Sequence, residues 1–542
     1  MNLYTNRLSV GQIITLVGSK LLDDIKAVVP FIDTAVLPRD IESAAYLKEI
    51  FPSFITLDLL NGDTFKKNLI ELLTEKEFEA EFTDFIRPAC TYVQNIELIL
   101  KLKWSVKNME FCTRFLTVFD LSFGLLPSER IIKSDFEYLK VSQTPYKQLK
   151  NYQLEVYLES LKELKTDSNK FIIQMPTGSG KTRTAMEIIV TVLNEAKAGE
   201  FVVWLAHSTE LCEQAEECFM QVWSHAGQGA LKIFRAWGDN AGFPCDDLAK
   251  GFVIAGFDKT RAMIKNNKIE AHKMKDLCQL IVIDEAHKTI APSYLTSIMG
   301  LSGSKTKTVG LTATPGRSLD NDEENSKLSN FFNDRKITFS SLGNPIEYLR
   351  KEKVLASATF VEVAGSDVAL TKSQVSSVGE DDFSYEILRS LGEDSLRNIH
   401  ILKALLIECE KGGQIIYFAP SVEQSKFISS CLVFKGVKAF HVDGSTSTDT
   451  RSEKLDLFKS GKIQVICNFG VLTTGFDAPK TDVIFIARPT RSIVLYSQMI
   501  GRGLRGPKVG GKASCRIIQV KDNFANFPDA NNLFNYFDKY FE

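Results

Sequence analysis

Short apolar runs separated by longer amphipathic stretches organise the middle and the end of this 542-residue sequence. Buried strands that alternate with helices are typical of a parallel α/β sheet, which gathers ligand-binding groups at the carboxyl ends of its strands. Between residue 146 and about residue 337 such runs have the length of buried strands, and each ends in a polar or small cluster. They are Phe171 to Met175, Phe201 to Ala206, Phe252 to Phe257, Leu280 to Asp284 and Thr308 to Thr314.

The same pattern restarts after two polar, acidic and serine-rich stretches, 318–334 and 366–394, which we interpret as linker sequence. The second set of runs is Gln414 to Ala419, Ala439 to Gly444, Ile463 to Asn468 and Asp482 to Ala487. The sequence therefore predicts two α/β domains, over 146–340 and 345–522, the second with an acidic linker at about 366–394. The aromatic-rich tail 523–542 is expected to form a docked helix.

Residues 1–145 have a different pattern, rich in Leu, Ile, Phe, Glu and Lys and poor in Gly. Apolar residues recur at helical spacing over Thr64 to Lys76 and Ile96 to Lys107, which predicts a mainly helical domain. The first histidine of the chain is His207, so no histidine-dependent nuclease centre can lie in this region. We expect an accessory domain that docks a partner or clamps nucleic acid, and any cleavage activity on another polypeptide.

Composition narrows the class of protein. With 44% hydrophobic and 24% charged residues the chain is typical of a globular protein, and a net charge of −2 argues against a passive nucleic-acid coat. The ten cysteines form no CxxC pair, which disfavours a zinc ribbon and favours reduced thiols in the cytoplasm. No signal peptide is recognisable, and no apolar run reaches the roughly 18 residues of a membrane span.

The first chemistry-bearing stretch is QMPTGSGKT, Gln174 to Thr182, between a predicted strand and a predicted helix. Gly178 and Gly180 allow backbone N–H groups to surround phosphate oxygens, and the helix N-terminus adds its dipole. Lys181 supplies positive charge to the outer phosphates of ATP, and Thr182 a hydroxyl ligand for Mg²⁺. Met175 stands where the usual phosphate-loop pattern has glycine, so a glycine-rich turn before a helix is the alternative.

The second stretch, IVIDEAH, ends an apolar run in Asp284 and Glu285. Asp284 would hold Mg²⁺ through water, and Glu285 would orient and deprotonate the attacking water. An acidic turn after a strand is the alternative.

The third stretch is QMIGRGLR, in which Gln498, Arg502 and Arg505 share one helical face by their i, i+4 and i+7 spacing. An arginine directed at the γ-phosphate from a second domain accelerates hydrolysis by roughly 10³ to 10⁵. The alternative is a basic helix face that is exposed to solvent or binds a phosphate backbone.

Together these stretches resemble the motif series of the superfamily 2 DEAD/DEAH-box helicases and translocases. Further stretches extend the resemblance from about residue 146 to residue 522: LKNYQ (149–153), WLAHSTELCEQ (204–214), LTATPGR (311–317), QIIYFAP (414–420) and LTTGFDAP (472–479). The combination is most similar to the motor subunits of type I and type III restriction enzymes, the ResIII-like group. The resemblance implies two RecA-like α/β domains with ATP and Mg²⁺ in the cleft and nucleic acid across both.

The resemblance also implies roles for individual residues. Adenine recognition falls to Gln153, and phosphate binding to the loop Pro176, Thr177, Gly178, Ser179, Gly180, Lys181 and Thr182. Hydrolysis falls to Asp284 and Glu285 with the Arg502 and Arg505 fingers, and coupling to His287, Thr312 and Thr314. Gly475 and Asp477 would line the nucleotide from the second domain. Contacts with the nucleic-acid backbone would come from His207, Ser208, Thr473 and Thr474, whose small polar groups bind phosphates without reading bases.

Two classes of function follow. The leading hypothesis is an ATP-dependent DNA helicase or duplex translocase that acts in DNA repair or phage defence. The second is a nucleic-acid-sensing ATPase that gates a partner effector, such as a nuclease, through residues 1–145. An RNA helicase is a third possibility, since these motifs do not reveal contacts with 2′-hydroxyl groups.

Overall fold

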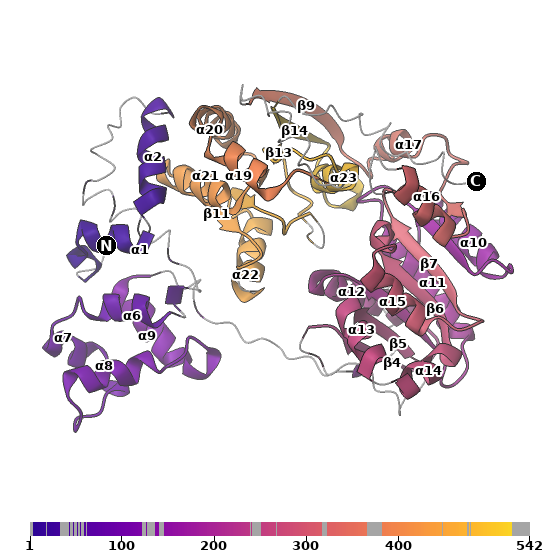
Figure 1. Cartoon of the computed structure of the whole chain (residues 1–542), viewed down its shortest axis with the longest axis horizontal. Helices are drawn as coiled ribbons and strands as arrows, with labels where there is room; N and C mark the ends of the chain where they lie inside the picture. Colours follow the sequence, from indigo (N-terminus) through magenta and orange to yellow (C-terminus); the bar gives the residue numbers. More distant parts are fainter. Residues whose placement is uncertain are drawn as a thin grey trace.

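The computed structural model describes most of the chain and is shown in Figure 1. The described residues are 4–17, 19–32, 43, 47, 51, 55, 59–60, 62–121, 126, 136–139, 146–238, 240, 251–266, 268–316, 322–365, 382–446, 448–473, 476 and 478–522. Within these ranges no helix is long and apolar enough to cross a membrane.

The first sheet forms the first lobe, in the order β1-β4-β5-β3-β6-β7-β2-β8. Its pairs are parallel except for β1 with β4, so the carboxyl ends of its central strands lie at one edge. The strands are β1 (Phe136–Leu139), β2 (Lys170–Gln174), β3 (Phe201–Ala206), β4 (Leu231–Ala236), β5 (Gly251–Gly256), β6 (Cys278–Asp284), β7 (Lys307–Thr312) and β8 (Lys336–Ile337).

Helices cover both faces of this sheet because alternate strand residues carry apolar side chains to opposite faces. Val202, Trp204 and Leu311 belong to the core shared with α10–α12, and Val203, Leu205 and Ile281 to the core shared with α14–α16. The helices are α10 (Asn151–Leu164), α11 (Lys181–Glu195), α12 (Thr209–Ala226), α13 (Phe257–Asn266), α14 (Lys268–Leu277), the 3₁₀ turn η5 (Ala286–Lys288), α15 (Pro292–Leu301), α16 (Asp322–Phe331) and α17 (Pro345–Lys351).

The second sheet forms the second lobe, in the order β11-β12-β10-β13-β14-β9, with parallel pairs throughout. Its strands are β9 (Ser357–Ala364), β10 (Ile415–Phe418), β11 (Ala439–Val442), β12 (Val465–Asn468), β13 (Val483–Ile486) and β14 (Ser514–Lys521). Its helices are α19 (Tyr385–Glu393), α20 (Ser395–Glu410), α21 (Val422–Phe434), α22 (Thr448–Lys459), α23 (Ile493–Gly501) and η6 (Pro507–Val509).

The N-terminal residues form a separate helical core beside the second lobe (Figure 1). It combines aliphatic side chains with aromatic contacts, such as those of Phe111 and Phe115 with Trp104. Helix α2 leaves this core: Ile25, Val28 and Val29 pack into the core of the second lobe with α20 and α21. The helices are η1 (Thr5–Arg7), α1 (Val10–Val17), α2 (Ser19–Ile32), α6 (Asp63–Ile70), α7 (Glu75–Glu81), η2 (Thr83–Phe85), α8 (Tyr92–Leu100), η3 (Val106–Asn108) and α9 (Met109–Phe119).

The predicted α/β class with an N-terminal helical region is therefore confirmed, with differences in detail. Strand β1 precedes the predicted boundary at residue 146 and yet joins the first sheet. The stretch 64–76 is not one helix, because Thr74 and Glu77 form a reciprocal capping box that starts α7.

The stretches interpreted as linker contain α16 and α19, so that interpretation was wrong for these segments. Each helix has apolar residues on one face that are buried, including Leu328 in α16 and Leu388 and Leu391 in α19. The predicted C-terminal helix lies outside the described residues.

Candidate active site between the two lobes

The glycine-rich loop connects β2 to α11 at the carboxyl edge of the first sheet. Gly178 and Gly180 have φ of 82° and 88°, a left-handed conformation that suits glycine. The hydroxyl of Ser179 donates to the carbonyl of Pro176 at 2.7 Å and closes the loop. Lys181 and Thr182 then begin α11, whose first N–H groups lack intrahelical acceptors. The loop thus has the backbone of an anion cradle.

Helix α10 contacts the glycine-rich loop through the side chain of Gln153. Gln153 is buried, and its Nε2 donates at 3.4 Å to the carbonyls of Ser179 and Gly180, while its Oε1 accepts the Lys150 N–H at 3.0 Å. A Cβ at Gly180 would lie only 2.4 Å from Gln153 Nε2, so this position requires glycine. The predicted adenine-recognising residue therefore contacts the phosphate loop directly.

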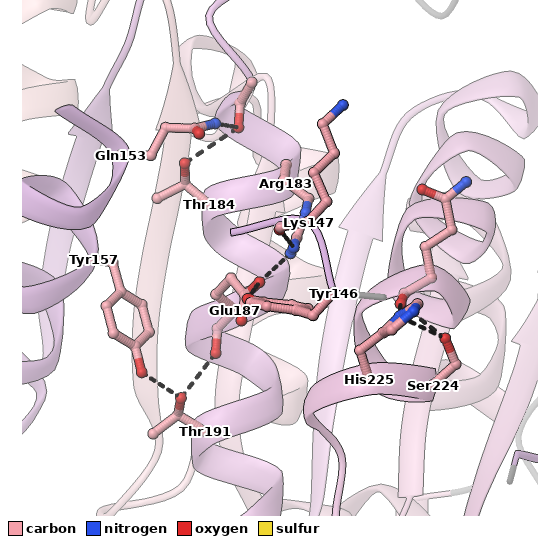
Figure 2. Close-up of polar contacts among 12 residues, drawn as sticks. Tyr146, Lys147, Gln153, Tyr157, Arg183, Thr184, Glu187, Thr191, Ser224 and His225 are labelled. Atoms are coloured by element: carbon pink, nitrogen blue, oxygen red, sulfur yellow. Dashed lines mark hydrogen bonds and ion pairs between the residues drawn. The ribbon is translucent and has the colours of Figure 1, made fainter. Parts of the chain in front are cut away.

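A second polar network ties the segment before α10 to α11 (Figure 2). Glu187 accepts hydrogen bonds from Tyr146 and from Arg183, and Arg183 also donates to the Lys147 carbonyl at 2.8 Å. The Arg183 guanidinium lies 5.4 Å from the centre of the Tyr146 ring, which is within the range of cation–π attraction. These contacts hold the segment that leads into α10, the helix on which Gln153 lies. They were not predicted from the sequence.

The two carboxylates lie at the end of β6. Strand β6 pairs with β7, and β7 pairs with β2, the strand that leads into the glycine-rich loop. Burial raises the pKa of Asp284, although Lys181 opposes the shift. Burial also disfavours the charge of Glu285, but nearby positive charge, chiefly that of Lys181, outweighs it and lowers the pKa. Lys181 and the carboxylate pair therefore face one space, and Glu285 stays ionised at neutral pH, as a general base must.

The predicted coupling residues are in contact with one another. His287 Nδ1 lies 3.4 Å from both Glu285 Oε2 and Thr312 Oγ1, and the Thr312 hydroxyl donates to the Thr314 carbonyl at 2.8 Å. Because Thr312 donates elsewhere, it accepts from His287, and burial lowers the pKa of His287 to about 3, which keeps the ring neutral. A continuous series of polar contacts thus joins the end of β6 to the end of β7.

Two predicted nucleic-acid contacts follow β3. The Ser208 hydroxyl accepts the Leu211 N–H at 3.4 Å and caps α12, so it has a structural partner. His207 Nε2 accepts from Lys288 Nζ at 2.9 Å. Both residues lie at the same sheet edge as Asp284, because β3 and β6 are parallel neighbours.

The second lobe differs from prediction in one respect. Helix α23 ends at Gly501, so Gln498, Arg502 and Arg505 do not share a helical face. A Cβ at Gly503 would lie 2.3 Å from Cys515 Sγ, and the close packing there turns the chain until Arg505 pairs with Leu355 in an isolated bridge. The expectation of one continuous helix was wrong for Arg505.

Both arginines nevertheless lie near the first lobe's site. Arg502 donates to the carbonyls of Phe476 and Thr473 at 2.6 and 2.7 Å, and its charge reaches Glu285. Arg505 Cγ would be 3.7 Å from a Cβ at Gly178, so the aliphatic part of the Arg505 side chain lies against the glycine-rich loop. Gln498 is buried, and its Nε2 has no partner among the described residues. Thr474, Gly475 and Asp477 lie outside the described residues.

A cleft separates the lobes at this point. Its lining comes from both lobes and from the segment that joins them: Pro176, Thr177, Ala313, Thr314, Ile346, Leu355, Ser497, Ile500, Gly501 and Leu504. A Cβ at Gly501 would lie 2.6 Å from the Thr177 methyl group, so the lobes touch beside the phosphate loop.

The residues present fit a bound ATP and Mg²⁺. The positive φ values of Gly178 and Gly180 give the loop the backbone of an anion cradle, and Thr182 with Asp284 would provide the hard oxygen ligands that Mg²⁺ prefers. Among the described residues no group of three His, Cys, Asp or Glu side chains is arranged to hold a metal ion.

Comparisons with known families agree with this geometry. Residues 146–317 match the family model of the type III restriction enzyme res subunit, and residues 397–506 match the helicase conserved C-terminal domain. The two matches lie on the first and second lobes and include the loop, the carboxylates and the arginines. The chain therefore carries both domains of the superfamily 2 helicases, and its first lobe matches the group of restriction-enzyme motors.

Individual relatives cover the same part of the chain. The ATP-dependent helicase IRC3 of Saccharomyces cerevisiae is 26% identical over 68% of this chain and 51% of its own length. A 51.5 kDa protein of a Lactococcus phage is 25% identical over 62% of each chain. The chain thus spans about half to three-fifths of the length of these curated relatives. A solved HsdR fragment of a type I restriction enzyme from Vibrio vulnificus shares the fold, with a TM-score of 0.51, 18% identity and coverage of 78% of this chain and 72% of that one.

Proposed function

We propose that this protein is an ATP-dependent DNA helicase or double-stranded DNA translocase that couples hydrolysis to movement along nucleic acid. The observation that carries the proposal is that three groups lie close together around the glycine-rich loop. The glycine loop with Lys181 and the Asp284–Glu285 pair come from the first lobe, and Arg505 approaches the loop from the second.

Each residue has a defined task in this proposal. ATP supplies the phosphoanhydride bond that is cleaved. The loop N–H groups and Lys181 hold the phosphates, Thr182 and Asp284 hold the ion, and Glu285 takes a proton from the attacking water. Arg505 compensates negative charge that grows in the transition state, a role worth roughly 10³ or more in rate.

Coupling to nucleic acid would use the edge of the first sheet. His207 and Ser208 at the end of β3, with Thr473 across the cleft, are small polar groups suited to phosphates rather than to bases. Binding should therefore be strongly salt-dependent with little sequence preference. The series of polar contacts from Glu285 through His287 to Thr312 and Thr314 would couple closure of the cleft to this edge of the sheet.

The choice of DNA is supported by the names of relatives, not by a contact. One relative is a subunit of the type I restriction endonuclease EcoAI of Escherichia coli, and another is the Hachiman protein HamB of Bacillus cereus, similar over 24% of this chain. A role in phage defence, with DNA repair as the alternative, is proposed on this basis. Other relatives are named as RNA helicases, such as RRP3 of Meyerozyma guilliermondii.

The deciding experiment measures ATP hydrolysis by the purified chain with single-stranded DNA, duplex DNA and RNA side by side. The proposal predicts strong stimulation by DNA and weaker stimulation by RNA. Lys181→Ala should remove both basal and stimulated activity, which excludes a contaminating ATPase. A rate that no nucleic acid changes would refute the proposal, and stimulation by RNA alone would replace DNA with RNA.

A second candidate function is a sensor whose ATP cycle gates a partner effector. The packing of Ile25, Val28 and Val29 against α20 and α21 favours it, because the N-terminal helices must then move with the second lobe. A stoichiometric protein that co-purifies with the full chain, and leaves when ATP and DNA are added, is the expected result. Absence of such a partner in every nucleotide state would count against it.

A further inference from the structure

His207 and Lys288 join the ends of two neighbouring strands. His207 follows β3, and Lys288 closes the 3₁₀ turn that follows β6. The strands are parallel, with Leu205 opposite Ile283, so both residues emerge at the same sheet edge. Their side chains meet at 2.9 Å between Lys288 Nζ and His207 Nε2.

The chemistry of this contact fixes the state of the histidine. A lysine ammonium only donates, so Nε2 accepts and the ring hydrogen lies on Nδ1. Burial, followed by the charge of Lys288, lowers the pKa of His207 to about 4, and the ring is therefore neutral at pH 7. The Nδ1–H group is buried and has no partner among the described residues.

The same turn carries the hydrolytic carboxylate. The Lys288 N–H donates to the Glu285 carbonyl at 3.0 Å, and Glu285 adopts a left-handed φ of 51°. That conformation is unfavourable for a non-glycine residue, so the surrounding contacts must hold the turn in place. The Lys288–His207 contact is one of the restraints on the turn. It connects the turn to the residue that directly follows β3.

We propose that Lys288 is a positioning residue that links a nucleic-acid phosphate at His207 to the orientation of Glu285. The inference rests on the proposed function. A phosphate that arrives at the end of β3 competes with His207 Nε2 for the Lys288 ammonium. That competition changes the hold of Lys288 on the turn, and Glu285 moves with that turn.

The test compares the ratio of DNA-stimulated to basal ATPase rate in variants of the full chain. Lys288→Met removes the ammonium and keeps the length, and it should lower this ratio about tenfold, a typical coupling between two sites. Lys273→Met on α14 removes an exposed lysine of the same lobe and should leave the ratio unchanged.

A second pair of variants tests the hydrogen bond itself. His207→Gln keeps an acceptor for Lys288 and should retain more of the ratio than His207→Leu, which has none. A normal ratio in Lys288→Met, or equal ratios in the Gln and Leu variants, would overturn the inference while the proposed function stands. A wild-type chain that no nucleic acid stimulates would refute both.

Discussion

The two lobes share an architecture and differ in what they bring to the cleft. The first lobe presents charged groups at the end of β6 and at the start of α11: the charge of Lys181 favours the ionised forms of Asp284 and Glu285, and Arg502 of the second lobe also favours that of Glu285. The second lobe lines the cleft with the apolar side chains of Ile500 and Leu504, and two arginines, Arg502 and Arg505, lie beside the first lobe's site. One of these, Arg502, is already bound to carbonyls of its own lobe.

The two lobes therefore contribute different steps to hydrolysis. A buried carboxylate pair beside a lysine is suited to binding a nucleotide and its ion, whereas the arginines matter only when the lobes approach. The first lobe should therefore bind ATP and activate the attacking water. The second lobe should determine whether hydrolysis can proceed, since its arginines act only when the lobes are close. Substitutions in each lobe can separate these two effects.

The largest effect is expected at the base in the first lobe. Glu285→Gln removes proton acceptance without changing shape and should lower the turnover number about 10³ to 10⁴-fold, while ATP affinity changes little. Steady-state ATPase rates and a direct nucleotide-binding titration check it. Glu200→Gln, on the same lobe but away from the cleft, is the matched control. Normal turnover in Glu285→Gln would remove this residue from the chemistry.

The next effect tests the second lobe. Arg505→Ala should lower the turnover number about 10³-fold because transition-state charge goes uncompensated, again with ATP still bound. Arg389→Ala, an exposed arginine on α19, should have no effect. If Arg505→Ala behaves like this control, the idea that the second lobe completes the site loses its main support.

A smaller effect is expected where the lobes touch. Gly501→Ala places a methyl group 2.6 Å from the Thr177 side chain and should hold the lobes apart, lowering turnover by roughly tenfold. Thr177→Ala in the same chain removes the nearest methyl group and should restore part of the rate. Failure of the double variant to recover would show that Gly501 acts within its own lobe instead.

The smallest effect concerns stability in the first lobe. The folded-state pKa of His207 is about 4 and its ordinary value is 6.5, so the unfolded chain binds a proton first as the pH falls. Stability from this site is complete above pH 6.5 and declines towards pH 4. The melting temperature of His207→Gln should fall less steeply over this window than that of the wild type, and parallel curves would contradict the assignment.

The fold could be predicted where strands are apolar throughout, as in β3 and β6. Strand β4 was missed because Lys232 and Arg235 interrupt its apolar pattern, although both are buried and Arg235 pairs with Glu216. Strand β9 was missed because its residues are largely exposed at the sheet edge. The docking of α2 on the second lobe depends on contacts between distant segments, which local periodicity does not contain.

The site was predictable to the extent that motifs dictate local backbone. Gly178, Lys181 and Asp284 lie where the strand–loop–helix pattern places them. The position of Arg505 was not predictable, because packing of Gly503 against Cys515 ends the helix early. Lys288 follows the recognised carboxylates directly, yet only the fold brings it to His207.

If closure of the two lobes completes the site, and nucleic acid drives this closure, the distance between the lobes must change when both ligands bind. Energy transfer between fluorophores on unnatural amino acids at Glu159 in the first lobe and Glu410 in the second measures that distance change. We expect the transfer efficiency to change when a non-hydrolysable ATP analogue and DNA are both present, and to change little with either alone. An efficiency that stays the same in all four conditions would show that nucleic acid does not drive closure.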